Sequence, residues 1–360
     1  MARTPETASI VRQLVAMSLR VSVAMATYNG ERFIREQLDS ILSQTRLPSE
    51  IVICDDGSTD ATVALIHEVL SQEVCESRGI TLKVQVNRRN LGPGKNFQRA
   101  ISLCTEDVIA LADQDDVWFP EKLQTLVGML EDDDAILLVH SDARLVDARS
   151  RALSMSLSQG LGMSDSEKRA IISGHSLPSI IRRNLVTGTT AVFRRELGEL
   201  AFHDFTIDLH DSRLAIVASM LDSLRFTPKE LVAYRQHESN QIGGKPLSAL
   251  DTVVALLKSW LELTDVLRQR NRELEDLLEQ LGDRVSPRNR SIVKGRVLHN
   301  EWRIGLPSSR LLRVWPVLWG SMRGRYRRWG RFPHDATRDL LMPPREILLS
   351  LIRRFSRKFL

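Results

Sequence analysis

The chain has 360 residues, of which 42% are hydrophobic and 26% charged, a composition typical of a folded protein with a core. Disordered and collagen-like chains are thereby excluded, and the length suggests two domains, or one large domain with an appendage. Only three cysteines occur (Cys54, Cys75 and Cys104), which excludes a disulfide scaffold or zinc knuckle and favours a reducing compartment.

Charge and hydropathy bear on location. No apolar stretch of about 18 residues is present, so no membrane-spanning helix is predicted. Residues 9–19 are mildly apolar but contain Arg12 and Gln13, which argues against a secretory signal and favours the cytoplasm. The net charge is +5, but residues 301–360 hold 14 Lys and Arg against 4 Asp and Glu, so the basic charge is concentrated there.

Strands and helices are predicted to alternate over roughly the first two thirds of the chain. Apolar, β-branched runs predict strands at 20–25, 50–54, 80–86, 107–111, 136–140, 186–193 and 223–227. Amphipathic spacing predicts helices at 31–44, 60–74, 95–104, 119–131 and 210–220, with Ser58 or Thr59 capping the second. Residues 150–180 are expected to form a loop with short helical pieces. This order indicates an α/β fold with an open, mostly parallel sheet and helices on both faces.

The pattern changes from residue 247. Leucines recur at helical spacing over 250–281, which predicts one long amphipathic helix or two. Residues 301–360 then combine arginines with four of the six tryptophans. We therefore expect an N-terminal extension (1–19), an α/β domain (20–246, with halves 20–120 and 121–246) and a helical, basic C-terminal region (247–360).

Three polar loops directly follow predicted strands, at the edge where open α/β sheets bind ligands. Residues 113–116 carry three carboxylates, Asp113, Asp115 and Asp116. Like charges this close repel, so a hard cation such as Mg²⁺ or Mn²⁺ would account for them. A solvated acidic turn in which Asp116 caps the helix at 119–131 explains the same spacing equally well.

The other two loops carry Tyr28-Asn29 and Asp55-Asp56. A short acidic side chain there has the chemistry to accept the N–H of a nucleobase or the hydroxyl of a ribose. An Asx turn leading into the next helix is the alternative. The ring of Tyr28 would stack on a base, or only close its loop.

Taken together, these loops resemble the nucleotide-diphospho-sugar transferases of glycosyltransferase family 2, fold type GT-A. The resemblance covers residues 20–243, through 21–60, 87–120 and 184–243, and DQDDVW and YRQHESN look most like the bacterial rhamnosyltransferase-type branch. It implies a metal-dependent inverting transferase. The implied reaction moves a sugar, with rhamnose expected, from a dTDP- or UDP-sugar to a surface polysaccharide or lipid-linked glycan.

The resemblance also assigns donor-binding roles. It implies that Asp56 binds the pyrimidine and that the nucleotide pocket is lined by Ala26, Thr27, Tyr28 and Glu31, where Ala26 departs from the commoner threonine. Asp113 and Asp115 match the family's DxD motif. Asp115 would hold the divalent cation, Mg²⁺ or Mn²⁺, on the diphosphate, and Asp113 would contact ribose or a metal-bound water.

The remaining roles lie on other loops. Asp211 matches the position of the family's general base, with His210 as its rival and the N-cap of helix 212–220 as its structural alternative. Arg235 and His237 are candidates to clamp phosphate or complete the metal shell, although His237 fits a hydrogen-bonded loop histidine equally well. Two further loop residues are expected to touch the donor sugar, Arg89 and Asn90.

The C-terminal region lies outside the resemblance. Arginines beside tryptophan and phenylalanine are typical of an interfacial membrane segment, so residues 301–360 are expected to bind a membrane peripherally, at the cytoplasmic face of the bacterial inner membrane. No nucleic-acid partner is expected, although the charge would suit one. A helical subdomain that packs its aromatics on the core or on a second subunit is the alternative.

Two other functions compete with glycosyl transfer. A nucleotidyltransferase uses a similar sheet and metal, but it usually carries a lysine in the loop after its first strand, and residues 26–30 have none. A catalytically silent, membrane-docked scaffold would not need Asp113, Asp115 and Asp211 together. A phospho-acceptor receiver domain is disfavoured because residues 113–116 offer no isolated aspartate.

Overall fold

The computed structural model describes residues 18–202, 210–237, 257–344 and 347–349. Its contacts divide the chain into two units. Unit 1 holds the residues up to Ser176 together with Leu185–Gln236, and unit 2 holds Leu177–Asn184 and the residues from His237 on. The expected domain boundary between 246 and 247 falls outside the described residues and stays a prediction. No sequence pattern indicates the transfer of 177–184 to unit 2.

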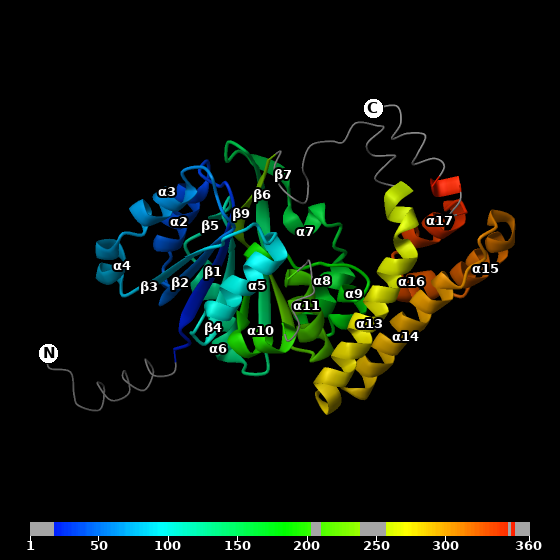
Figure 1. Cartoon of the computed structure of the whole chain (residues 1–360). Coiled ribbons are helices and arrows are strands. Elements are labelled where there is room, and N and C mark those ends of the chain that lie inside the picture. The colour runs from blue at the N-terminus through cyan, green and yellow to red at the C-terminus, as the bar shows by residue number, and fades with distance from the viewer. Residues whose placement is uncertain (1–17, 203–209, 238–256, 345–346, 350–360) are drawn as a thin grey trace, which may run out of the picture. The chain divides into compact units, whose positions relative to one another are not determined.

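Unit 1 is built around a nine-stranded sheet in the order β3-β2-β1-β4-β8-β6-β9-β5, with β7 added by pairing to β6 (Figure 1). Each of the seven predicted strands overlaps an observed one, and β5 and β7 are additional. The strands are β1 (Val21–Thr27), β2 (Glu50–Asp55), β3 (Thr81–Val86), β4 (Val108–Asp113), β5 (Val117–Trp118), β6 (Leu138–Asp147), β7 (Ala152–Ser156), β8 (Ala191–Arg194) and β9 (Leu224–Gln236).

The sheet is parallel in its first half and mixed in its second. Strands β3, β2, β1 and β4 run parallel, and so do β6 and β9. Strand β8 runs antiparallel to both β4 and β6, and β5 runs antiparallel to β9. The expectation of a mostly parallel sheet therefore describes β3, β2, β1 and β4 but not the remaining strands, because hydrophobic periodicity identifies a strand but not its direction.

Helices cover both faces of the sheet. They are α2 (Ile34–Leu42), α3 (Thr62–Val69), α4 (Gln72–Arg78), α5 (Pro93–Leu103), α6 (Lys122–Asp132), α7 (Leu157–Gly160), α8 (Asp165–Ile172), α10 (Arg195–Ala201) and α11 (His210–Met220). The single helix predicted at 60–74 is two helices, because Ser71 caps α4 by accepting from the Val74 N–H. The N-cap residue of α3 is Ala61, which forms no side-chain cap, so the expected cap at Ser58 or Thr59 is wrong.

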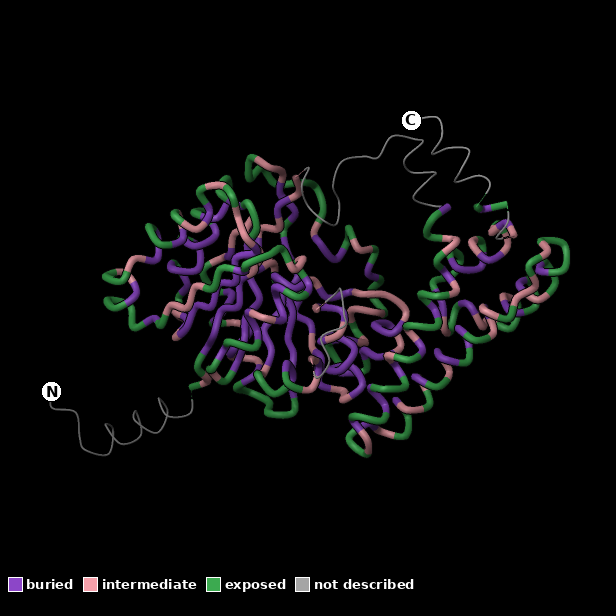
Figure 2. The backbone as a smooth tube through the Cα atoms, in the orientation of Figure 1, coloured by how far each residue is buried: buried purple, intermediate pink, exposed green. Residues whose placement is uncertain are grey.

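The core follows from strand alternation. In β1, Val21, Val23 and Met25 point to one face and belong to a cluster that includes apolar residues of α2, α3 and α6. On the other side, α5 packs against β1, β2 and α11. Because the parallel strands are covered twice, every residue of β2 is buried (Figure 2).

Unit 2 is helical. It contains α9 (Leu177–Ile180), α13 (Leu263–Leu281), α14 (Pro287–Ile304), α15 (Arg310–Met322), α16 (Arg325–Trp329) and α17 (His334–Leu341). The amphipathic helix expected over 250–281 is confirmed for α13, whose leucines face α14, while residues 250–256 lie outside the described part. Among the described helices, none has the length and apolar character needed to span a bilayer.

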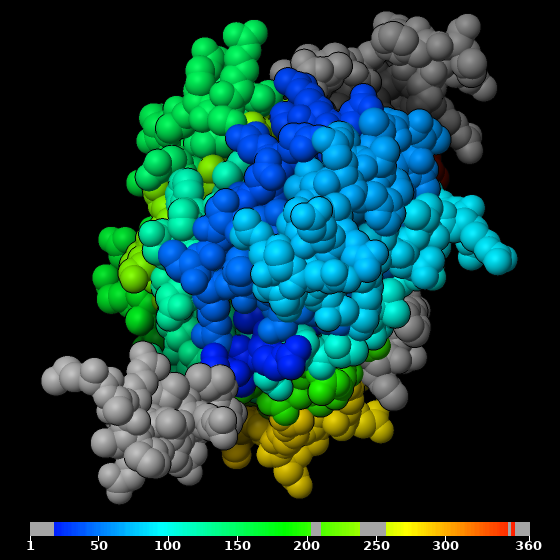
Figure 3. Space-filling model, turned by 90° about the vertical axis from the view of Figure 1, so that its left-hand side faces the viewer, coloured from blue at the N-terminus to red at the C-terminus, as the bar shows by residue number. Residues whose placement is uncertain are grey.

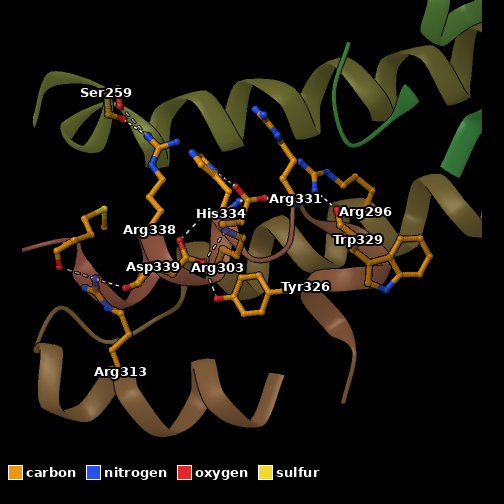
Figure 4. Close-up of polar contacts among 12 residues, drawn as sticks. Ser259, Arg296, Arg303, Arg313, Tyr326, Trp329, Arg331, His334, Arg338 and Asp339 are labelled. Atoms are coloured by element: carbon orange, nitrogen blue, oxygen red, sulfur yellow. Dashed lines mark hydrogen bonds and ion pairs between the residues drawn. The ribbon is translucent and has the colours of Figure 1, made fainter. Parts of the chain in front are cut away.

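A buried polar network holds the end of unit 2 together (Figure 4). Arg303 donates two hydrogen bonds to the Asp339 carboxylate, each 2.8 Å long, and lies 3.3 Å from Asp335. The Tyr326 hydroxyl donates to the same Asp339 carboxylate over 2.7 Å. These side chains come from α14, α16 and α17, so the network fixes three helices of this unit to one another.

Candidate active site

The strand registers bring the polar loops to one edge of the sheet. Thr27, the last residue of β1, lies opposite Asp55 at the end of β2, and Ala26 lies opposite Asp113 at the end of β4. The loops after all three strands therefore leave the sheet side by side, as the sequence predicts. Figure 3 shows a face of unit 1 that is formed largely by the first part of the chain, drawn in blue to cyan, which includes β1, β2 and the loops after them.

Asp55 shapes the loop after β2. Its carboxylate accepts from the Thr27 hydroxyl (2.7 Å), the Ser58 N–H (2.7 Å) and the Ser58 hydroxyl (2.6 Å). The Asx-turn alternative thus applies to Asp55, whose oxygens are used within the loop.

Asp56 is buried beside it and is fixed by a different set of donors. Its Oδ1 accepts from the Asn87 side chain and the Leu91 N–H, each over 2.8 Å, and its Oδ2 accepts from the Gly92 N–H over 2.9 Å. Asn87 is held in turn by Asn96 over 2.8 Å. The carboxylate is therefore rigidly oriented, and Oδ2 accepts fewer protein donors than Oδ1.

Gln114 links the loop after β4 to the loop after β1. Its side chain accepts from the Tyr28 N–H (2.9 Å) and donates to the Tyr28 carbonyl (3.1 Å). Gly30 leaves room for this contact, since an added Cβ would collide with the Gln114 carboxamide. The Tyr28 ring is 48% exposed. Glu31 lies on the same loop, where it accepts from the Ala61 N–H at the start of α3 over 3.0 Å.

Four carboxylates gather at the end of β4. Burial and the charges of Asp116, Asp115 and Asp211 raise the pKa of Asp113 well above its ordinary value. Burial and Asp115 likewise raise the pKa of Asp116. The structure therefore brings together Asp113, Asp115 and Asp211, which are separated by almost a hundred residues in the sequence.

Asp116 is buried and holds the backbone of β9. It is fully buried and accepts from the backbone N–H of Arg235 over 2.9 Å. Helix α6 begins at Lys122 without a side-chain cap. The alternative in which Asp116 is a solvated helix cap is therefore wrong.

The Arg235 guanidinium is buried under the same loop. It donates to the Asp115 carbonyl (2.7 Å), the Ser150 hydroxyl (2.7 Å) and the Glu36 carboxylate (2.6 Å), and it lies over the Phe33 ring. The phosphate contact predicted for Arg235 would require some of these bonds to break.

Lys122 is buried near the carboxylates of Asp113 and Asp116. Its Nζ donates to the Thr189 carbonyl over 2.7 Å and lies 3.1 Å from the centre of the Trp118 ring. Burial lowers the pKa of Lys122, while Asp116 and Asp113 oppose that shift. Lys122 is not among the predicted site residues, although its spacing from Leu126 and Leu130 places it on the buried face of α6.

Asp211 and His210 begin helix α11. Asp211 is 8% exposed and lies in the first turn, where its Oδ1 accepts from the Ser212 N–H. The His210 ring stacks on Phe97 with centroids 4.1 Å apart. A Cβ on Gly188 would lie 3.0 Å from His210 Nε2, so this glycine makes room for the ring; it lies in a 3₁₀ turn (Gly188–Thr190) and not in the predicted strand.

The remaining predicted residues lie on loops. Arg89 lines a cavity of about 450 Å³ beside β3, together with Arg88 and Arg99. The Asn90 side chain accepts from the Gly92 N–H over 3.0 Å, next to Asp56. His237 directly follows β9 and is assigned to unit 2. The predicted roles of Arg89, Asn90 and His237 stay predictions.

The residues at the end of β4 suit a hard cation by their chemistry, since their donors are carboxylate oxygens. Among the described residues, no group of three or more His, Cys, Asp or Glu side chains is arranged to hold a metal alone. A cation here would therefore use one or two carboxylates and complete its shell with phosphate and water, which is the usual arrangement for Mg²⁺.

Known proteins are similar to this chain in sequence and in fold. Residues 22–196 match the profile of the family described as Glycosyl transferase family 2. An uncharacterised glycosyltransferase of Nostoc sp. is 27% identical over 329 residues, 86% of this chain and 92% of that protein. The dTDP-rhamnosyl transferase RfbG of Shigella flexneri is 39% identical over 109 residues, which are 29% of this chain and 36% of RfbG.

Solved structures also resemble the chain. One is Staphylococcus aureus TarS 1-349 in complex with UDP-GlcNAc (TM-score 0.51, 20% identity, 79% of this chain and 73% of that one). Another is the mannosyltransferase PcManGT of Pyrobaculum calidifontis in complex with GDP-Man and Mn²⁺ (TM-score 0.50, 18% identity, 94% of this chain and 83% of that one).

Proposed function

This chain belongs to glycosyltransferase family 2 through residues 22–196 and has the GT-A fold, and on that premise we propose that it is a metal-dependent, inverting transferase using a nucleotide-diphosphate sugar. The observation that carries the proposal is the gathering of Asp113, Asp115 and Asp211 at the carboxyl end of β4, on the same edge of the sheet as the rigid Asp56. The proposed donor is a dTDP- or UDP-sugar with rhamnose as the sugar, in line with the local similarity to RfbG.

The nucleotide is proposed to lie along the edge formed by β1 and β2. Asp56 Oδ2 would accept an N–H of the pyrimidine as a second donor beside the Gly92 N–H. The exposed Tyr28 ring would stack on the base, held in place by the two hydrogen bonds between Gln114 and the Tyr28 backbone. Thr27, Ala26 and Glu31 would complete this side of the pocket, and Arg89 and Asn90 would approach the sugar.

The diphosphate is proposed to lie at the end of β4. Asp115 would hold Mg²⁺ or Mn²⁺ there, with Asp113 and His237 as further ligands. When bound, the cation would neutralise charge on the departing diphosphate. The position of Asp115 itself depends on Arg235, which donates to its carbonyl from below. We therefore assign Arg235 a positioning role instead of the expected phosphate contact.

Asp211 is proposed as the general base. As the acceptor hydroxyl forms its bond to the anomeric carbon, the bond from that carbon to the diphosphate oxygen breaks on the opposite face. Asp211 takes the hydroxyl proton, and the nucleoside diphosphate leaves. The neighbouring His210 is stacked on Phe97, and burial lowers its pKa, so it would carry no positive charge near neutral pH. The acceptor is proposed to be a surface polysaccharide or lipid-linked glycan, reached by peripheral association with a membrane through residues 301–360.

Calorimetric titration with UDP, dTDP and GDP, each with and without Mn²⁺, tests the donor site. One nucleotide is expected to bind in a metal-dependent manner, and Asp115→Ala is expected to abolish this binding. Asp211→Asn is expected to keep the binding but to release no nucleoside diphosphate from the matching sugar donor.

Each alternative has its own outcome. Absence of binding by all three nucleotides would favour the scaffold, and release of pyrophosphate in place of nucleoside diphosphate would identify a nucleotidyltransferase. Full turnover by Asp211→Asn would refute the role of Asp211 as base.

A further inference from the structure

Helix α15 turns its apolar side outward. At about 100° per residue, seven large apolar side chains fall on one arc of about 160°. All seven are exposed, from 40% for Trp319 to 87% for Leu311. They are Leu311, Leu312, Val314, Trp315, Leu318, Trp319 and Met322, and we call this surface the α15 face. A helix on a water-facing surface normally shows the opposite pattern, so the α15 face requires an explanation.

The inner side of α15 is anchored by a polar residue. The buried Arg313 guanidinium donates to four backbone carbonyls, those of Pro307, Ser308, Asp339 and Met342, at 2.7–3.1 Å. Figure 4 shows Arg313 beside Asp339. Gly320 lies against the Trp302 ring, where a Cβ would approach it to 2.8 Å. Helix α15 cannot roll its leucines inward without breaking these contacts, so their exposure is built into the fold of unit 2.

Positive charge surrounds the α15 face. Residues 302–334 contain eight arginines and no aspartate or glutamate. The exposed ones lie just before and after the apolar arc, at Arg310, Arg323, Arg327, Arg328 and Arg331. Arg323 also stacks over the Trp319 ring, with its guanidinium carbon 4.5 Å from the ring centre.

This combination selects the chemistry of the partner. An apolar centre with two tryptophans and a rim of one charge sign suits the interface of a bilayer that contains anionic phospholipid. A second copy of the chain would bring the same arginines against each other, which is unfavourable. Nucleic acid would satisfy the arginines but would leave the leucines exposed to water.

We propose that α15 inserts the α15 face into the interface of an anionic phospholipid bilayer, with the flanking arginines on the lipid headgroups. This inference deepens the membrane association included in the proposed function. It rests on residues of unit 2 alone and does not depend on the transferase chemistry.

Flotation of the full chain with phospholipid vesicles tests the proposal. Vesicles of phosphatidylcholine with about 30% phosphatidylglycerol are expected to bind the chain, and pure phosphatidylcholine vesicles far less. The double variant Leu311→Gln/Trp315→Gln is expected to bind at least about tenfold more weakly. Leu298→Gln is the matched control, because this leucine of α14 is 63% exposed but lies outside the α15 face, and its binding should equal that of the unaltered chain.

Further measurements separate insertion from charge alone. Brominated lipid is expected to quench the tryptophan fluorescence of the unaltered chain. The quenching should be weaker for the double variant Leu311→Gln/Trp315→Gln. Arg327→Gln/Arg328→Gln is expected to reduce binding severalfold on anionic vesicles only, and raising the salt to about 0.5 M should have a similar effect. Thermal melts of each variant confirm that unit 2 is folded.

Two outcomes would overturn the proposal. One is the same vesicle binding by the double variant and the unaltered chain. The other is absence of binding to anionic vesicles, together with self-association in sedimentation that the double variant abolishes, which would assign the face to a second copy. Donor binding measured without vesicles reports on the active site separately, so failure of one proposal is distinguishable from failure of the other.

Discussion

Replacement of Arg235 by methionine is expected to destabilise unit 1 and to displace the loop at 113–116. Its guanidinium is 2% exposed and makes hydrogen bonds to the Asp115 carbonyl, the Ser150 hydroxyl and the Glu36 carboxylate. A hydrogen bond from a charged group contributes about 2 kcal/mol, and an ion pair with a half-exposed partner such as Glu36 about 0.5 kcal/mol. Loss of all three contacts is therefore expected to lower the free energy of unfolding by about 4.5 kcal/mol.

Urea unfolding and steady-state kinetics together check this prediction. Because Asp115 loses the donor that positions its backbone, kcat/KM is expected to fall at least about tenfold along with stability. Glu36→Gln serves as the control, since it removes only the exposed partner and should cost at most about 1 kcal/mol. If Arg235→Met raised only the KM for the donor and left unfolding unchanged, the guanidinium would be contacting phosphate and the reasoning would fail.

Three other predictions concern separate parts of the chain. Gly30→Ala places a Cβ against the Gln114 carboxamide, so calorimetry should show nucleotide binding weakened severalfold, whereas Gly128→Ala, with no atom within 4 Å, should leave it unchanged. The pKa of Asp335 is lowered because Arg303, the Arg331 N–H and Arg296 outweigh the opposing effect of burial. The Asp335 carboxylate therefore contributes its full stabilisation above about pH 4 and loses it as the pH falls through its lowered pKa. In thermal melts of the full chain, Asp335→Asn should reduce the loss of stability at acidic pH. Burial raises the pKa of Cys54 to about 11 and of Cys104 to about 12, so a maleimide at about pH 8 should label neither until urea is added. Labelling of Cys54 or Cys104 in the folded chain would contradict this prediction.

Strands β1, β2 and β4 were predictable from the sequence because they are buried on both faces. Such strands appear as uninterrupted apolar runs, as at 51–54 and 108–112, and the polar residues that end them must lie at one edge. The antiparallel strands were harder to predict. Strand β5 has only two residues and shows no period, and β8 has only four, so the strand predicted at 186–193 begins too early and includes a 3₁₀ turn.

The site was predictable in its acidic residues but not in the residues that hold them. The spacing at 113–116 marks a carboxylate cluster, yet it does not show that Asp116 is buried under Arg235. Gln114 and Lys122 make their contacts with Tyr28 and Thr189, which are distant in sequence. Pairings of this kind depend on the tertiary fold, and local sequence patterns carry no information about them.

Asp55 and Asp56 show the same limit at neighbouring positions. Both are aspartates at the end of one strand, but Asp55 closes its own loop through Ser58, whereas Asp56 accepts from the loop that follows β3. Their roles differ because neighbouring side chains of an extended segment point to opposite faces of the sheet.

The assignment of residues 177–184 to unit 2 has a consequence for how the chain is made and dissected. Helix α9 packs on α14, and Arg182 donates to the Arg327 carbonyl, yet both partners are synthesised more than a hundred residues later than this segment. Residues 177–184 are therefore synthesised before the helices on which they pack. A fragment ending at residue 236 would therefore carry a stretch of chain whose partners have been removed, and deleting 177–184 along with the C-terminal helices is the cleaner way to isolate unit 1.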